Sequence, residues 1–252
     1  MLIHGRHAVV EALATRTALR VFVARGVRAS TLTDMERQAR AAGVPVELVP
    51  RIELDRALKT TSHQGIAAEL AELAYADPEA PFELAERRGE RPLIVTLDQV
   101  TDPRNYGAII RCAEALGAHA VVSESRRSPP LSASVAKTAA GAASHLPLVQ
   151  VTNLPRYLRE LKERGLWVFG SASDAASAAH EVDWDRDVAL VIGAEGRGMR
   201  RLVRETCDEV VRVPLRGRIA SLNAAAATAV LLHDIGLGRE GARTAGALPQ
   251  SP

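Results

Sequence analysis

This chain of 252 residues is poor in cysteine, in aromatic side chains and in long apolar runs. Its two cysteines cannot build a disulfide framework, and no Cys/His spacing is typical of a zinc site, so we expect no metal. No apolar stretch is long enough to cross a bilayer, and the N-terminus lacks the apolar core of a signal peptide. We therefore expect a cytoplasmic protein with no membrane partner.

The net charge is only +2, which excludes a polybasic tail protein, yet the arginines are unevenly distributed. A locally basic face on a nearly neutral protein can bind a polyanion. Solvated surface charge is the alternative explanation. The clusters are Arg16, Arg20, Arg25 and Arg28, then Arg126-Arg127, then Arg197, Arg200, Arg201 and Arg204.

The first part of the chain, residues 1–74, has the pattern of a small α/β domain. Residues 75–91 are rich in Asp, Glu, Pro and Arg and are expected to form a partly helical linker. The tail, residues 239–252, is rich in Gly and Ala and is expected to be disordered. In the first domain we expect strands at 21–24 and 46–49, a strand or a mixture of strand and helix at 66–73, and helices at 8–13, 32–42 and 52–58.

The second part, residues 92–238, alternates strand and helix signals. Such alternation predicts an α/β fold with a parallel sheet and helices on both of its faces. We expect strands at 93–97, 120–122, 148–151, 167–170, 188–192 and 210–213, and helices at 106–116, 132–143, 154–164 and from 224 to about 234.

Two of these strands end in segments typical of a ligand edge. The strand 188–192 opens into Gly193-Ala194-Glu195-Gly196-Arg197-Gly198, and the strand 210–213 leads to Pro214 and to Ser221-Leu222-Asn223. Ligands of open α/β sheets bind at the carboxyl ends of the strands. Glycines let the backbone approach a ligand closely, although ordinary turns and caps also use them. The G-x-x-G-x-G spacing does not match a dinucleotide-binding fingerprint.

A third segment follows the strand 93–97. Asp102-Pro103 has turn chemistry, and Asn105 is expected to cap the next helix. Arg111 is four residues beyond Gly107 and therefore shares a side of that helix with it. By itself this pattern describes a capped helix with a surface arginine.

Taken together, the three segments resemble the motifs of the SpoU (TrmH) family of RNA ribose 2′-O-methyltransferases. The matching residues are Asn105-x-Gly107-x-x-x-Arg111, Gly193-x-Glu195-Gly196-x-Gly198, and Pro214 with Ser221-Leu222-Asn223. Residues 3–13 and 63–68 look like the N-terminal substrate-binding domain of the ribosomal-RNA members. The resemblance covers nearly the whole chain and is strongest to members that methylate a guanosine ribose in 23S rRNA.

The resemblance implies a SPOUT domain whose parallel sheet contains a deep trefoil knot. Knots are almost absent from proteins in general, so this expectation comes from the resemblance alone. The resemblance also implies S-adenosylmethionine as cofactor, a homodimer, and an RNA partner held by an N-terminal domain similar to a ribosomal RNA-binding protein (L30e-like).

The same resemblance assigns roles to particular residues. Arginine is a poor general base because it stays protonated, so Arg111 is expected to bind phosphate and stabilise developing negative charge. The implied cofactor-binding residues are Gly193, Val213, Leu215 and Leu222. The implied catalytic residues are Arg111, Asn105, Glu195, Ser221 and Asn223.

Two alternative functions remain open at this point. One is ribose methylation of tRNA, and the other is a non-catalytic RNA-binding or ribosome-assembly role on the same scaffold. Gln99, Tyr106 and Ala224-Ala225 depart from the usual family pattern. None of them is among the residues to which chemistry is assigned.

Overall fold

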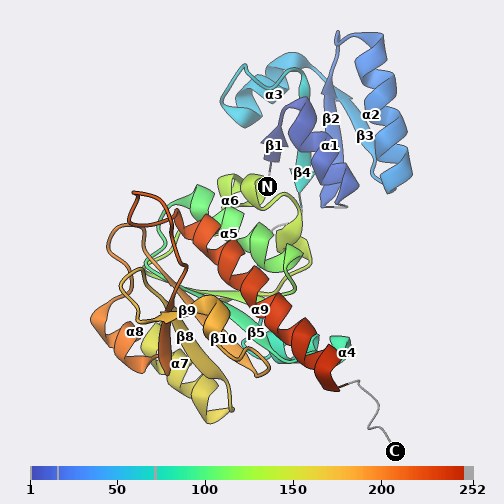
Figure 1. The fold of residues 1–252 in the computed structure, drawn as a ribbon. Coiled ribbons are helices and arrows are strands. Elements are labelled where there is room, and N and C mark those ends of the chain that lie inside the picture. The colour runs from blue at the N-terminus through green and yellow to red at the C-terminus, as the bar shows by residue number, and fades with distance from the viewer. Residues whose placement is uncertain (1, 16, 71–72, 247–252) are drawn as a thin grey trace, which may run out of the picture. The chain divides into compact units, whose positions relative to one another are not determined.

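The structure is a computed structural model that describes residues 2–15, 17–70 and 73–246, and its contacts divide the chain into two units (Figure 1). The first unit contains residues 1–74 and 131–144, and the second contains 75–130 and 145–252. This division differs from the sequence-based one at two places. Residues 131–144 pack with the first unit, and residues 75–91 pack with the second.

The first unit is built on a four-stranded mixed sheet. Its order is β1 (Leu2–His4), β4 (Ile66–Leu70), β2 (Ala18–Ala24), β3 (Val46–Val49). Strand β4 runs antiparallel to both of its neighbours, whereas β2 and β3 are parallel. The helices of this unit are α1 (Arg6–Ala14), α2 (Ala29–Ala42), α3 (Arg51–Leu58) and α6 (Ala133–Ala139), with a 3₁₀ turn at Ala142–Ser144.

A buried histidine fixes the turn that precedes β4. His63 Nδ1 accepts a hydrogen bond from the Gly65 N–H at 3.0 Å, and His63 Nε2 lies 2.7 Å from Asp55 Oδ1. Gly65 has a φ of 73°, and a Cβ at this position would lie 2.5 Å from Val27. This turn therefore requires glycine at position 65.

The second unit is built on a seven-stranded sheet in which every pairing is parallel, which confirms the predicted fold class. Pure parallel pairing explains why the central strands are buried on both faces and read as continuous apolar runs. The strand order is β7 (Leu148–Val151), β6 (Ala120–Glu124), β5 (Leu93–Asp98), β10 (Val188–Gly193), β8 (Trp167–Ser171), β11 (Glu209–Arg212), β9 (Ser177–Ala178).

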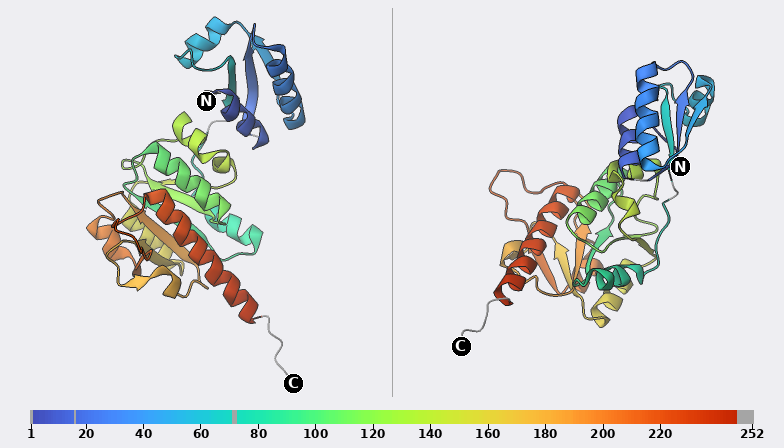
Figure 2. Two further views of the ribbon diagram at one scale, coloured as in Figure 1. Left: turned by 45° about the horizontal axis from the view of Figure 1, so that its top comes forward. Right: turned by 90° about the vertical axis from the view of Figure 1, so that its right-hand side faces the viewer.

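Helices cover both faces of this sheet (Figure 2). Helices α4 (Ala80–Arg88), α7 (Leu154–Glu163) and α8 (Arg201–Thr206) contribute apolar residues to the core on one face. Helices α5 (Pro103–Ala115) and α9 (Ala224–Gly246) pack against each other on the other face. No helix in the described ranges is long and apolar enough to span a membrane.

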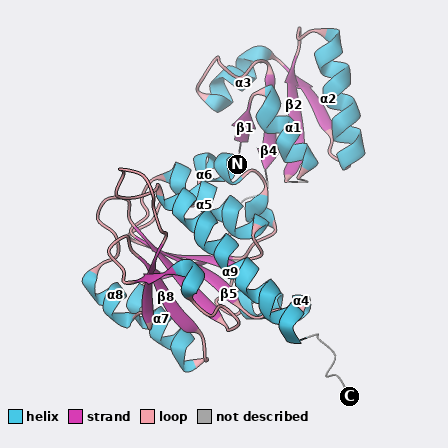
Figure 3. Ribbon diagram, viewed as in Figure 1, coloured by secondary structure: helices cyan, strands magenta, loops and turns pink. Residues whose placement is uncertain are grey.

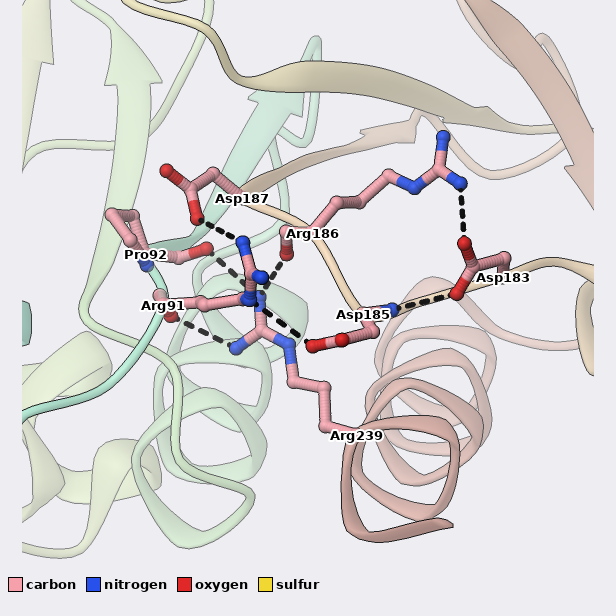
Figure 4. A network of polar contacts seen from close by, with 7 residues as sticks. All are labelled: Arg91, Pro92, Asp183, Asp185, Arg186, Asp187 and Arg239. Carbon is pink, nitrogen blue, oxygen red and sulfur yellow. Dashed lines mark hydrogen bonds and ion pairs between the residues drawn. The ribbon is translucent and has the colours of Figure 1, made fainter. Parts of the chain in front are cut away.

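Helix α9 is longer than the sequence predicts, because residues 239–246 are helical where a disordered tail is expected. The reason is tertiary. The Arg239 guanidinium donates hydrogen bonds to the backbone carbonyls of Arg91, Pro92 and Arg186, which lie just before β5 and β10 (Figure 4). The part of the predicted tail at 247–252 lies outside the described residues.

The arginines at this amino end of the sheet are closely paired. Arg91 forms ion pairs with Asp185 at 3.1 Å and with Asp187 at 3.6 Å, and Arg186 pairs with Asp183 at 2.7 Å (Figure 4). Burial lowers the pKa of Arg239, while Asp187 opposes that shift. The arginines at this end of the sheet are therefore engaged by carboxylates and backbone carbonyls of the chain itself.

A second buried histidine supports the same end. His119 Nδ1 accepts a hydrogen bond from the Leu93 N–H at 3.0 Å, so the neutral ring carries its proton on Nε2, 3.1 Å from Glu90 Oε2. Burial lowers the pKa of His119 below its ordinary 6.5. The negative charge of Glu90 raises this pKa, and the positive charge of Arg88 lowers it. Protonation would place a second donor against the Leu93 N–H.

We predict that His119 makes the fold acid-sensitive. Since its pKa is lower in the folded than in the unfolded state, the unfolded chain gains the proton first, and stability falls as the pH drops below about 6.5. The variant His119→Asn keeps an acceptor near the Leu93 N–H and does not titrate. Thermal unfolding between pH 5 and 8 should show a steeper loss of Tm for the parent chain than for H119N. Parallel Tm curves would contradict the prediction.

Candidate functional site

The carboxyl ends of the parallel strands lie at one end of the second unit, where long loops gather (Figure 3). These loops enclose a cavity of about 270 Å³. Its wall is made by the ends of β8 and β10, the loop after β11 and the start of α9. The lining residues are Ser171, Ala172, Ser173, Ile192, Gly193, Ala194, Glu195, Gly196, Gly198, Val213, Leu215, Ala220, Ser221, Leu222, Ala224 and Ala227.

The glycine-rich loop is closed by its own backbone. The N–H of Ala194 donates to the Gly198 carbonyl at 3.1 Å, and the N–H of Gly198 donates to the Ala194 carbonyl at 2.8 Å. Gly196 and Gly198 have φ values of 79° and 67°, a region that favours glycine. A Cβ at Gly193 would lie 2.5 Å from Met199 N and 2.8 Å from Gly198 O. The chain thus folds back against Gly193 at the cavity wall.

Gly193→Ala is expected to displace this loop. The added Cβ meets backbone atoms, which cannot rotate away as a side chain would. A displacement near 1 Å at a catalytic site costs roughly 100-fold in rate. We also expect this displacement to weaken the binding of S-adenosylmethionine, the cofactor that the resemblance implies. Calorimetric titration would measure it. Gly236→Ala on α9 is the matched control, because its Cβ has no atom within 4 Å. Equal affinity in the two variants would contradict the expectation.

The interior of the cavity suits a partly apolar ligand. Ile192, Val213, Leu215 and Leu222 supply apolar surface, and the glycine loop supplies backbone polar groups. Small-molecule sites combine these two features, with a few polar groups that orient the ligand. All four residues that the resemblance assigns to the cofactor, Gly193, Val213, Leu215 and Leu222, line this one cavity.

Three polar residues assigned to catalysis are joined by hydrogen bonds beside the cavity. Asn223 Nδ2 donates to Asn105 Oδ1 at 2.7 Å, and Asn105 Nδ2 donates to Glu195 Oε2 at 3.2 Å. Asn223 Oδ1 also accepts from the backbone N–H of Ala225 at 2.8 Å and so caps α9. The chain of bonds fixes the starts of α5 and α9 against the glycine loop.

Asn105 is not the N-cap of α5, which corrects the sequence-based expectation. Asp102 is the cap, and its carboxylate accepts from the Arg104 N–H at 2.8 Å. Pro103 occupies the first turn, where a missing N–H costs nothing and the fixed φ suits a helix. The side chain of Asn105 is therefore free to join Glu195 and Asn223.

The remaining two predicted catalytic residues are placed differently from each other. Ser221 lines the cavity, and its side chain is exposed. Arg111 lies on the exposed face of α5 and is not part of the cavity wall. Among the described residues Arg111 has no hydrogen-bond or ion-pair partner, so its guanidinium is available to a ligand.

Sequence reasoning missed a buried charge cluster at this edge. Arg200 Nε lies 2.6 Å from Asp98 Oδ1, its backbone N–H donates to Asp98 Oδ2 at 2.7 Å, and its Nη2 lies 2.6 Å from Glu124 Oε2. Asp98 is fully buried and ends β5, and Glu124 ends β6. The available signal was an acidic residue at the end of each of two neighbouring apolar strands. The cluster anchors the chain that leaves the glycine loop.

A neutral buried pair joins α5 to the end of β6. The Tyr106 hydroxyl and Ser123 Oγ are 3.1 Å apart. Burial raises the pKa of Tyr106 to about 12. Tyr106 thus packs at the base of α5 as a neutral core residue, although it departs from the family pattern. No group of side chains that could hold a metal ion occurs in the part of the chain that the structure describes.

Comparison with protein families finds two matches that together cover most of the chain. Residues 92–233 match the SpoU rRNA Methylase family. Residues 2–76 match the family described as RNA 2′-O ribose methyltransferase substrate binding. The substrate-binding match precedes the methylase match along the chain, and residues 77–91 separate the two.

Individual proteins are similar over nearly the whole length. The 23S rRNA (guanosine-2′-O-)-methyltransferase RlmB of Yersinia pestis is 40% identical over 93% of this chain and 96% of its own. A putative TrmH family tRNA/rRNA methyltransferase of Bacillus subtilis is 38% identical over 92% and 93%. The AdoMet complex of the SpoU methyltransferase AviRb from Streptomyces viridochromogenes has the same fold, with a TM-score of 0.72, 22% identity, and coverage of 96% and 91%.

Proposed function

This chain belongs to the SpoU rRNA methylase family, and we propose that it transfers a methyl group from S-adenosylmethionine to the 2′-hydroxyl of a guanosine ribose in 23S rRNA. The observation that carries the choice of substrate is the similarity to a 23S rRNA guanosine methyltransferase along almost the whole of both chains. The match of residues 2–76 to a substrate-binding domain supports RNA as the partner.

The cavity residues fit the proposed cofactor. The backbone of Gly198 and Met199 folds tightly against Gly193 at the cavity wall, and Val213, Leu215 and Leu222 provide an apolar slot for an adenine ring. When bound, S-adenosylmethionine supplies an electrophilic methyl group, and its transfer to the ribose oxygen leaves S-adenosylhomocysteine and a proton. Fixed walls favour this displacement because alignment of the reacting atoms supplies much of the acceleration.

The polar residues beside the cavity hold the surrounding loop and helix starts in place and orient the substrate. In the proposed mechanism Glu195, Asn105 and Asn223 keep the loop and both helix starts in place, and Ser221 contacts cofactor or RNA. Arg111 binds the phosphate next to the target nucleotide and stabilises charge that develops on the 2′-oxygen. A permanently protonated guanidinium suits that electrostatic role and does not suit proton removal.

We also propose the knotted path and the homodimer that the family resemblance implies. The strand order supports a crossing path, because β10 lies between β5 and β8 although it follows both of them in the sequence. The loops between β10 and α9 would form the knot and would carry the cofactor wall. Size-exclusion chromatography with light scattering would test the dimer.

A second candidate is methylation of tRNA, favoured by the tRNA/rRNA name of the Bacillus subtilis relative. Transfer of a tritiated methyl group to unmodified 23S rRNA and to unmodified tRNA would separate the two. We expect incorporation into 23S rRNA alone, at one nucleotide found by mapping 2′-O-methyl groups. Incorporation into tRNA alone would favour the second candidate. Incorporation into neither, together with RNA binding, would indicate a non-catalytic assembly role.

A further inference from the structure

The arginines at the two ends of the seven-stranded sheet differ in whether their side chains have partners. At the amino end, Arg91, Arg186 and Arg239 are held by aspartates and backbone carbonyls (Figure 4). At the carboxyl end, five exposed arginines besides Arg111 have side chains with no hydrogen-bond or ion-pair partner among the described residues. They are Arg104 after β5, Arg126 after β6, Arg197 after β10, and Arg216 and Arg218 after β11.

The carboxylates of the carboxyl end are already engaged. Asp98 and Glu124 bind Arg200, Glu195 accepts from Asn105, and Asp174 pairs with Arg204 at 2.9 Å. Asp102 and Glu195 accept hydrogen bonds from neutral N–H groups and keep their charge, but these two carboxylates do not balance the five exposed arginines. An unbalanced group of cations around a cavity attracts polyanions and raises their local concentration.

The position of Arg216 and Arg218 separates them from the cofactor site. The segment 213–222 contributes Val213, Leu215, Ala220, Ser221 and Leu222 to the cavity wall, whereas neither arginine lines the cavity. Ile219, between Arg218 and the wall residues, is 65% exposed. The arginines thus occupy the outer side of a segment whose inner side faces the cavity.

We propose that Arg104, Arg126, Arg197, Arg216 and Arg218 form a phosphate track that binds the backbone of the substrate RNA on both sides of the target nucleotide. This inference rests on the proposed function for the identity of the RNA. Guanidinium groups bind phosphate through paired hydrogen bonds, and such contacts fix register without reading sequence. The track holds the RNA so that one ribose lies over the cavity mouth.

The test removes the two track arginines of the segment 213–222, which contributes five residues to the cavity wall. For R216Q/R218Q we expect the Kd for RNA to rise roughly 20-fold at 0.1 M salt. Each phosphate contact to single-stranded RNA raises the association constant by a factor of about [salt]^−0.7, which is roughly fivefold at this salt concentration, and two contacts are lost. The slope of log K against log salt should become shallower by about 1.4 for the same reason. Labelled transcripts that together cover 23S rRNA are first compared, and the one that binds the parent chain most tightly is chosen. Fluorescence anisotropy with this transcript then measures the Kd and its salt dependence. The affinity for S-adenosylmethionine, measured by calorimetry, should stay within twofold.

Two further variants control the result. R88Q/R159Q removes two exposed arginines from α4 and α7, which contribute nothing to the cavity wall, and should leave RNA binding unchanged. R216K/R218K retains the charge and should retain most of the salt slope. The circular dichroism and Tm of all variants should match the parent chain at pH 8, where His119 is neutral, because the exchanged side chains make no hydrogen bond or ion pair within the described residues.

Several outcomes would contradict the proposal that these arginines bind the RNA backbone. One is an RNA Kd for R216Q/R218Q equal to that of R88Q/R159Q. Another is a weakened affinity for S-adenosylmethionine with RNA binding intact, which would assign these arginines to the cofactor. A parent chain that binds no transcript would also overturn it. If the parent chain binds RNA through the track yet transfers no methyl group, the track stands and the proposed function fails.

Discussion

Replacing Arg111 by alanine is expected to lower methyl transfer by roughly 10²–10³-fold, the usual cost of removing one donor that stabilises charge in a transition state. The affinity for S-adenosylmethionine should remain within twofold, because Arg111 lies on the exposed face of α5 and outside the cavity wall. Single-turnover kinetics with saturating RNA and calorimetry with the cofactor would measure the two effects separately.

A purely structural role for Arg111 would give a different result. Its side chain has no partner within the described residues, so the Tm of Arg111→Ala should equal that of the parent chain. Arg111→Lys keeps the charge but loses the two-pronged geometry, and it should recover only part of the rate. A loss of cofactor affinity as large as the loss of rate would contradict the role proposed here.

Arg200→Met should be the most destabilising of the substitutions considered. It leaves Asp98, which is fully buried, and Glu124 without their cation. Breaking a buried pair in this way costs about 3–5 kcal/mol. For a chain of this size the Tm should fall by roughly 10 °C, and thermal unfolding followed by circular dichroism would record it.

The helix that begins directly after Arg200 provides a matched comparison. Arg204 in α8 pairs with Asp174, whose side chain is 69% exposed, and exposed pairs contribute at most about 1 kcal/mol. Arg204→Met should therefore change the Tm by only a few degrees. Because Arg200 also anchors the chain after the glycine loop, R200M should weaken cofactor binding, whereas R204M should not. Similar Tm values for R200M and R204M would show that the buried cluster contributes little.

Local patterns were sufficient for the strands and for several helix ends. The strands at 46–49 and 148–151 occur with the predicted bounds, and α2 ends before Gly43 as expected. These features depend on apolar runs, on β-branched residues and on the left-handed backbone that glycine adopts, all of which are short-range. The start of α5 was misplaced because Asp102 and Asn105, three positions apart, are both good caps, and Pro103 decides between them.

At Gln99 the residue type alone does not predict the backbone conformation. The usual glycine is replaced there, yet the backbone still has a φ of 61°, in the region that favours glycine. The surrounding structure therefore imposes the turn on a residue that would avoid it in isolation, at a cost of about 1 kcal/mol or more. The close approach of the chain at Gly193, by contrast, leaves no alternative to glycine.

The sequence by itself determined the alternation of strand and helix, the parallel sheet that follows from it, and the motif residues that line a single cavity; the catalytic roles of those residues remain predictions. Only the tertiary structure decided which charges are paired. Asn105 and Asn223 are 118 positions apart and Asp98 and Arg200 are 102 apart, and the strand order brings each pair together. An arginine in a sequence is always a cation, but burial and neighbours make Arg200 and Arg239 part of the scaffold and leave Arg216 and Arg218 exposed to bind a ligand.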